Sequence, residues 1–217
     1  NPRKKVLAVD LDNTLWSGIL GEDGYQGILV DTDWPGNAYR DFQSFLRNLR
    51  ASGIILAILS KNNEDDVEEG FDQNKSMPLA LSDFSAKRID WIDKSANLTS
   101  IAEELNLSSD AFVFMDDNPL EVELMKEMRP EVTTVHATGT ASEFPHLLMA
   151  SGRMHSVTLT EEDSLRAESY TAQIARKDER KQVGDLETFL AGLDLRLEYR
   201  PPNASEMDRV AQLFTRT

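Results

Sequence analysis

Two aspartates that follow a short apolar run are the residues of this sequence best placed to do chemistry. The run Val6–Val9 leads directly into Asp10, and Asp12 comes two residues later. Side chains two positions apart along an extended strand point to the same side. The two carboxylates would therefore repel each other unless a cation, a proton or hydrogen-bond donors lay between them. This spacing predicts a metal ion or carboxylate chemistry, and the alternative at this stage is a strand that ends in a solvated acidic turn.

A second apolar run, residues 54–59, ends in groups that can bind an anion. Ser60 offers a hydroxyl, Lys61 an ammonium and Asn62 an amide, and all three can donate hydrogen bonds. We therefore expect these side chains to bind substrate. The competing interpretation is that Ser60 and the asparagines only cap the helix that starts near Glu64.

A third apolar run, residues 111–115, ends in another pair of carboxylates, Asp116 and Asp117. Asn118 and Pro119 follow, a combination typical of an N-cap and the first position of a helix. The sequence thus places a pair of acids at the ends of two different predicted strands.

Apolar strands and amphipathic helices alternate along the first 135 residues. This alternation indicates an α/β fold with a parallel sheet and right-handed crossovers. The carboxyl ends of parallel strands lie at one edge of a sheet, where such folds bind their ligands. Three polar strand ends would converge there, which helix capping alone does not explain. The expected strands are residues 6–9, 54–59, 79–81, 111–115 and 132–135, and the expected helices are residues 37–50, 64–70, 95–106 and one that begins at Pro119.

The residues just before the helix at 95–106 follow a less regular pattern. Apolar side chains in this stretch are expected to anchor it to the core: Phe84, Ile89, Trp91 and Ile92. Lys94 directly precedes the helix, and a lone lysine is by default a surface residue.

Glycines at positions 18, 21, 24 and 27 separate short apolar pairs within residues 17–30. This spacing favours a glycine-rich hairpin or flap rather than a helix. Because the segment directly follows the first acidic pair, it could fold over a site there. A plain surface hairpin is the alternative.

The composition limits the class of protein. The chain has 217 residues, 40% of them hydrophobic and 28% charged, which suits one α/β domain with an appendage. The formal net charge of −15 argues against nucleic acid or an anionic membrane as a main partner. No apolar run reaches the roughly 20 residues of a membrane span, and no signal peptide is recognisable. The absence of cysteine excludes disulfides and fits the cytoplasm, where we expect the protein.

The pattern changes after residue 140. We expect a core domain over residues 1–140 and a C-terminal helical or α+β extension over residues 141–217. The last predicted helix, residues 205–214, has no stop signal before Thr217. This suggests that the extension is the start of a longer C-terminal unit.

The set of polar strand ends resembles the four motifs of the haloacid dehalogenase (HAD) superfamily. The matching residues occur in the expected order and on the expected strand ends, within residues 6–135. They are the segment Asp10-Leu11-Asp12-Asn13-Thr14, then Ser60, Lys94 and the pair Asp116-Asp117. The resemblance implies a three-layer, Rossmann-like parallel sheet with a small flap.

A closer resemblance is to FkbH-like proteins of this superfamily. They carry segments DLDNTLW, GEDG, SKNNE, W-x-x-K-S-x-N and DDNP much as this chain does, at residues 10–16, 21–24, 60–64, 91–97 and 116–119. The segment at residues 159–163 is also FkbH-like. Proteins of this kind are associated with polyketide biosynthesis: they take a glyceryl unit from 1,3-bisphosphoglycerate, remove phosphate and load the unit onto an acyl carrier protein.

The resemblance implies a division of chemical roles. Asp10 would be the nucleophile that takes the phosphoryl group as an aspartyl phosphate, and Asp12 would protonate the leaving oxygen and later activate water. Ser60 and Lys94 would bind phosphoryl oxygens, and Lys94 would offset the charge of Asp10.

The resemblance also implies Mg²⁺ as the cofactor. Asp10, the backbone carbonyl of Asp12 and Asp116 would hold the ion, with Asp117 as a direct ligand or a helper behind it. A cation there would remove the repulsion between the carboxylates.

The chain departs from the FkbH-like pattern at Leu59. Members that load the glyceryl unit typically have a cysteine there, and a thioester cannot form on leucine. The leading hypothesis is Mg²⁺-dependent phosphoryl removal from 1,3-bisphosphoglycerate or a similar C3 acyl phosphate, with loading of the acyl unit onto a carrier protein. The alternatives are a stand-alone HAD phosphatase and a catalytically inactive docking domain.

Overall fold

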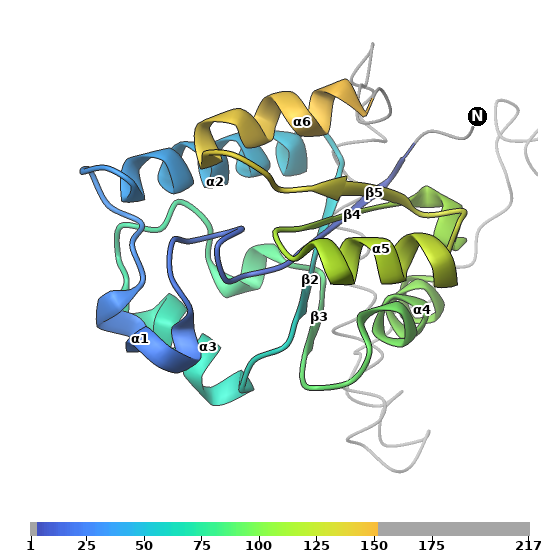
Figure 1. The fold of residues 1–217 in the computed structure, drawn as a ribbon, viewed down its shortest axis with the longest axis horizontal. Helices are drawn as coiled ribbons and strands as arrows, with labels where there is room; N and C mark the ends of the chain where they lie inside the picture. The colour runs from blue at the N-terminus through green and yellow to red at the C-terminus, as the bar shows by residue number, and fades with distance from the viewer. Residues whose placement is uncertain (1–3, 152–217) are drawn as a thin grey trace, which may run out of the picture. The chain divides into compact units, whose positions relative to one another are not determined.

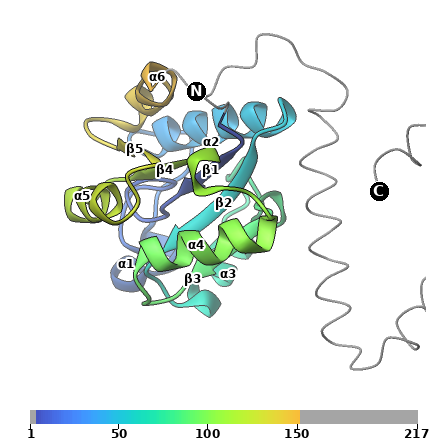
Figure 2. The same ribbon diagram turned by 90° about the vertical axis from the view of Figure 1, so that its right-hand side faces the viewer.

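A five-stranded parallel sheet forms the centre of the computed structural model, which describes residues 4–151. The strand order is β3-β2-β1-β4-β5, so β1 lies between β2 and β4 (Figures 1 and 2). Each neighbouring pair runs parallel. The strands are β1 (Val6–Val9), β2 (Ile55–Ser60), β3 (Ala86–Ile89), β4 (Phe112–Asp116) and β5 (Thr133–His136). The predicted α/β fold with a parallel sheet is confirmed.

Six α-helices accompany these strands within residues 4–151. Asn118 caps the start of α5 as predicted, where its side chain accepts the Leu120 N–H. Asp93 caps α4 and accepts the backbone N–H groups of Ser95 and Ala96. The helices are α1 (Leu20–Gly27), α2 (Gly36–Ala51), α3 (Glu64–Gln73), α4 (Lys94–Leu105), α5 (Pro119–Met128) and α6 (Phe144–Ala150), with 3₁₀ turns at Leu81–Asp83, Ser109–Ala111 and Ala141–Glu143.

Helices cover both faces of the sheet, and the side chains of β1 show why its sequence is apolar throughout. Leu7 and Val9 lie in one buried cluster with side chains of α2 and α6, whereas Val6 and Ala8 lie in a second cluster with side chains of α4 and α5. Figures 1 and 2 show these two pairs of helices on opposite sides of the sheet. A strand buried on both faces has no polar side, and the result is the expected three-layer architecture.

The prediction of a hairpin without helix at residues 17–30 was wrong, because this segment contains α1. An antiparallel bridge between Ser17 and Leu29 closes the base of the segment, so it does form a flap beside β1. The helix is interrupted at Gly24, whose φ of 65° suits a residue without a Cβ. The first residue of α1 is buried in the core, and this burial offsets the low helix propensity of the glycines.

Two predictions between residues 79 and 93 were also wrong. The strand of this region is β3, and residues 79–81 do not belong to the sheet. Phe84 and Ile89 are buried as expected, but Trp91 and Ile92 are 70% and 57% exposed. The loop that carries these two side chains lies past the end of β3, at the edge of the sheet rather than under a helix.

The segment after residue 140 begins with the 3₁₀ turn Ala141–Glu143 and continues into α6, which packs on α2. Phe144 and Leu148 are buried in the same cluster as the sheet, and the Phe144 ring contacts that of Phe42 edge-on at 5.3 Å between centroids. No helix in the described range has the length and apolar character needed to cross a bilayer. The remainder of the predicted extension, residues 152–217, lies outside the described residues, so its α+β character stays a prediction.

Candidate active site

Three strand ends meet at one edge of the sheet, as the sequence predicts. Asp10 follows β1, Ser60 ends β2 and Asp116 ends β4, and β1 pairs with both neighbours in parallel register. A cleft of about 370 Å³ opens there. Its lining includes nearly all the predicted site residues together with parts of the flap and of α5: Asp10, Asp12, Asn13, Ile19, Ser60, Lys61, Lys94, Asp116, Asp117, Asn118, Pro119 and Glu121.

Lys94 joins the acidic ends of β1 and β4. Its Nζ donates to Asp10 Oδ1 at 2.8 Å and to Asp116 Oδ2 at 2.6 Å. All three side chains are buried, and Lys94 is only 4% exposed, so the default expectation of a surface lysine was wrong. The position follows from the start of α4, where the Asp93 cap fixes the first turn over the strand ends.

Burial shifts the ionisation of the whole group. It raises the pKa of Asp10 to about 6, against the opposing effect of the Lys94 ammonium and with a further contribution from the Asp116 carboxylate. Burial likewise raises the pKa values of Asp116 and Asp117. Burial alone would lower the pKa of Lys94, but the Asp10 and Asp116 carboxylates outweigh it and raise that pKa. The site therefore holds one fixed cation, the Lys94 ammonium, which does not neutralise all three carboxylates.

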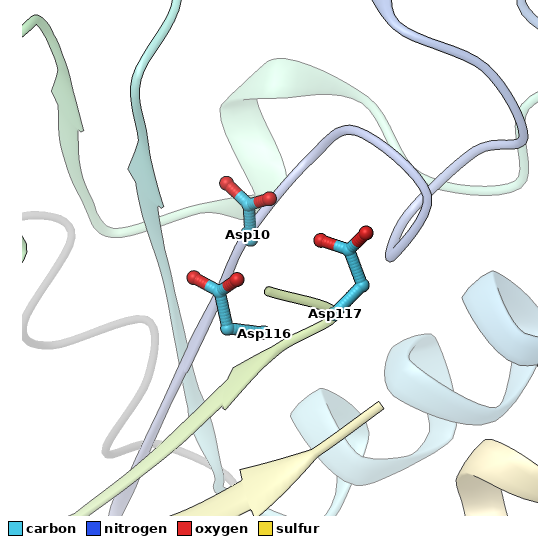
Figure 3. A group of neighbouring side chains, drawn as sticks. All are labelled: Asp10, Asp116 and Asp117. Atoms are coloured by element: carbon cyan, nitrogen blue, oxygen red, sulfur yellow. The ribbon is translucent and has the colours of Figure 1, made fainter. Parts of the chain in front are cut away.

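Asp10, Asp116 and Asp117 form the cluster that could hold a metal ion. Each offers a carboxylate oxygen, and these oxygens lie within 4.8 Å of one another. Figure 3 shows the three carboxylates at the ends of β1 and β4. Hard oxygen donors of this kind suit Mg²⁺. With Lys94 ionised, the group keeps two net negative charges, which a divalent cation would neutralise.

The Asp12 carboxylate is not part of this cluster and accepts three hydrogen bonds instead. Its Oδ1 accepts from Trp16 Nε1 at 2.9 Å and from the Leu20 backbone N–H at 3.0 Å. Its Oδ2 accepts from Asn62 Nδ2 at 2.9 Å. The metal ligand expected from this residue is its backbone carbonyl, and that role stays a prediction.

Asn62 connects the ends of β1 and β2. Besides Asp12, its amide nitrogen donates to Ser60 Oγ at 3.2 Å, and hydrogen bonding from Ser60 in turn favours the ionised form of Asp10. Both amide hydrogens of Asn62 are thus used within the protein. The expected role of Asn62 in substrate binding stays a prediction, and the structure adds a role in orienting the carboxylates.

Lys61 crosses the cleft to α5. Its Nζ donates to Glu121 Oε1 at 2.6 Å, and both side chains are partly shielded from solvent. Glu121 and Trp16 are site residues that the sequence analysis missed. The available signals were the position of Glu121 in the first turn of the helix after Asp117, and the short separation of Trp16 from Asp12 in the sequence.

Comparison with solved structures gives a similar protein from Bacteroides fragilis. It is the N-terminal part of the protein BF1531, which contains a phosphatase domain and was solved in complex with Mg. The two chains share 35% sequence identity with a TM-score of 0.69, over 72% of this chain and 42% of the other. This chain thus shares its fold with a Mg-bound phosphatase domain, and its parallel sheet flanked by helices is the HAD-like Rossmann fold. The chain spans well under half of the length of that relative.

Two further solved structures match more weakly. One is an uncharacterised protein from Corynebacterium glutamicum (16% identity, TM-score 0.45, 70% of this chain and 98% of the other). The other is 3-deoxy-D-manno-octulosonate 8-phosphate phosphatase from Moraxella catarrhalis (18% identity, TM-score 0.42, 68% and 87%). Both likenesses are too weak to add to the assignment. No protein-family model matches the chain, and no curated protein matches it.

Proposed function

We propose that this chain is a Mg²⁺-dependent phosphatase that works through an aspartyl phosphate on Asp10. The observation that carries the proposal is the buried network in which Lys94 bridges Asp10 and Asp116 while Asp117 completes an oxygen cluster. The HAD-type fold and the Mg-bound phosphatase domain of the Bacteroides fragilis relative support it.

The residues divide the reaction into two displacements. In the first, a carboxylate oxygen of Asp10 attacks phosphorus, the bond from phosphorus to the leaving oxygen breaks, and protonated Asp12 gives its proton to that oxygen. In the second, Asp12 takes a proton from water, the water oxygen attacks phosphorus, and the bond to Asp10 breaks. Inorganic phosphate leaves, and both aspartates return to their starting forms.

The other residues of the cleft would orient Asp10 and stabilise the negative charge of the phosphoryl group. Lys94 keeps Asp10 oriented and offsets charge on the phosphoryl oxygens, and Ser60 lies beside Asp10 to donate to them. Mg²⁺, when bound by Asp10, Asp116 and Asp117, would neutralise the carboxylates and the phosphoryl group. Phosphoryl transfer depends mainly on such positioning and neutralisation.

The finer proposal is the FkbH-like one: the phosphorylated substrate is 1,3-bisphosphoglycerate or a similar C3 acyl phosphate, and the acyl unit passes to an acyl carrier protein. The motif set supports it. Leu59 argues against a covalent acyl-enzyme step, because the position before Ser60 holds no thiol. The Leu59 side chain is instead fully buried in the apolar cluster with α4. Transfer would then have to go directly to the carrier thiol. An inactive docking domain is disfavoured by the intact Lys94 network.

Phosphate release tests the proposal. Wild-type protein, incubated with acetyl phosphate or 1,3-bisphosphoglycerate, should release phosphate only with Mg²⁺, and Asp10→Asn should lose at least about 10³-fold in rate. Asp41→Asn removes an exposed carboxylate from α2 with the same change of charge and should be as active as wild type. Full turnover by Asp10→Asn would contradict the proposal.

Adding holo acyl carrier protein to the same reaction separates the two levels of the proposal. A glyceryl mass shift on the carrier supports loading. Phosphate release without a mass shift supports a phosphatase alone.

A further inference from the structure

The carboxylate of Asp12 is clamped by donors from three different segments. Trp16 and the Leu20 N–H hold one oxygen, and Asn62 at the end of β2 holds the other. The Leu20 donor belongs to α1 of the flap. The orientation of Asp12 is thus set jointly by the turn after β1, by the flap and by a neighbouring strand end.

The turn after β1 brings the Trp16 indole back to Asp12. The Leu15 N–H donates to the Leu11 carbonyl at 2.7 Å, and Asn13 takes a left-handed backbone with φ of 50°. This tight turn closes with an isolated bridge between Asp12 and Trp16, which brings these two residues side by side. The Trp16 Nε1–H therefore points at the carboxylate that starts the turn.

Packing restricts the orientation of the Trp16 indole ring. Trp16 is fully buried, and its ring contacts Phe71 of α3 edge-on at 5.7 Å between centroids. A buried indole N–H needs an acceptor, and Asp12 is the acceptor it has. Packing of the ring thus fixes the direction of one hydrogen bond to Asp12.

We propose that Trp16 is a positioning residue for the acid step: it holds the Asp12 carboxyl where it can protonate the leaving oxygen. This inference rests on the proposed phosphatase function. It predicts a dependence on the leaving group. An alkyl phosphate needs a proton on its departing oxygen, whereas an acyl phosphate releases a stable carboxylate without one.

The test compares two tryptophan variants with two substrates. Trp16→Phe keeps a large ring in the core but removes the indole N–H that donates a hydrogen bond to Asp12. Trp91→Phe is the matched control, since Trp91 Nε1 also donates to a side chain at this edge of the sheet, Asn63 Oδ1 at 3.2 Å. The substrates are glycerol phosphate and acetyl phosphate. The measured quantity is kcat/KM, which covers only the steps through departure of the leaving group.

Trp16→Phe should lower kcat/KM about 10- to 100-fold with glycerol phosphate, a part of the roughly 10²- to 10⁴-fold supplied by a general acid. With acetyl phosphate the loss should stay within about threefold, and Trp91→Phe should change neither. In an Asp12→Asn background, Trp16→Phe should have no further effect on glycerol phosphate, because coupled residues are not additive.

Equal losses with both substrates, or no loss with either, would overturn the positioning role and leave the proposed function standing. Full activity of Asp10→Asn would instead remove the proposed function. If Trp16→Phe does not melt cooperatively, Asn62→Ala takes its place. This variant removes the donor to the other oxygen of Asp12. Its kcat/KM should fall more with glycerol phosphate than with acetyl phosphate, and equal values of this loss with the two substrates would equally overturn the inference.

Discussion

The two acidic strand ends are alike in sequence but are held in different ways. Asp10 and Asp116, the first acid of each pair, are buried and share the Lys94 ammonium. The second acids differ. Asp117 joins the first two acids in the oxygen cluster. The Asp12 carboxylate points away from this cluster and accepts hydrogen bonds from three N–H groups.

This difference shows how one strand end can serve two tasks. At β4 the acids are adjacent, and both carboxylates remain near the metal cluster. At β1 one residue separates them, and the turn that begins at Leu11 carries Asp12 to donors from Trp16 and the flap. The β4 end thus contributes two carboxylates to the oxygen cluster. In the proposed mechanism, the β1 end would supply a nucleophile, Asp10, and a separately oriented proton carrier, Asp12.

The largest expected effect comes from removing the cation that joins the two ends. Lys94→Met leaves Asp10 and Asp116 buried without a cationic partner, which should destabilise the metal-free protein by about 3–5 kcal/mol and abolish measurable phosphate release. Urea unfolding measures the stability. Lys126→Met is the control, because Lys126 pairs with Glu123 at the exposed surface and should contribute at most about 1 kcal/mol. Similar losses in both variants would contradict a special role for Lys94.

A smaller effect should distinguish the two acids of the β4 end. Asp116 is fully buried and tied to Lys94, whereas Asp117 is half-buried. We expect Asp116→Asn to weaken Mg²⁺ binding about 100-fold and Asp117→Asn about 10-fold, within the range seen for groups around a metal site. Calorimetric titration measures both, and a larger loss in Asp117→Asn would reverse the assignment.

Mg²⁺ binding should depend on pH because a proton competes for Asp10, whose pKa burial raises to about 6. Affinity should fall about tenfold between pH 7 and pH 5, since the ion needs the deprotonated carboxylate. The stability of the metal-free protein should change with pH in the opposite direction. A folded pKa above the unfolded value means that the metal-free protein should gain stability as pH falls through about 6. Affinity that is constant over this range would contradict the prediction.

The smallest effect concerns the helix start that positions Lys94. Asp93 caps α4, and the hydrogen bond from the Ser95 hydroxyl is the main cause that lowers the pKa of Asp93. Asp93→Ala should destabilise the protein by about 1 kcal/mol. A folded pKa below the unfolded value means that this contribution is present at neutral pH and is lost as pH falls below about 4. The difference in melting temperature between wild type and variant should therefore shrink in acid.

The sequence predicted the sheet and the meeting of its polar ends, because apolar runs and their abrupt ends are local signals. The local pattern could not predict that Lys94 is buried, since a lysine is buried only when partners from distant strands surround it, and only the motif resemblance placed Lys94 beside Asp10. The hydrogen bond from Trp16 to Asp12 depends on the turn after β1 and on the contact of the Trp16 ring with Phe71 of the distant α3. The helix in the flap was missed because glycine spacing says nothing about the burial of Leu20.

Direct detection of the phosphoryl group on Asp10 is the most immediate test of the proposed chemistry. Wild-type protein, quenched in acid during turnover of acetyl phosphate with Mg²⁺ and then digested, should carry one phosphoryl group on the peptide that contains Asp10. The group should be absent without Mg²⁺ and in Asp10→Asn. Phosphate release without any phosphorylated peptide, or with the group on another residue, would contradict the central role of Asp10.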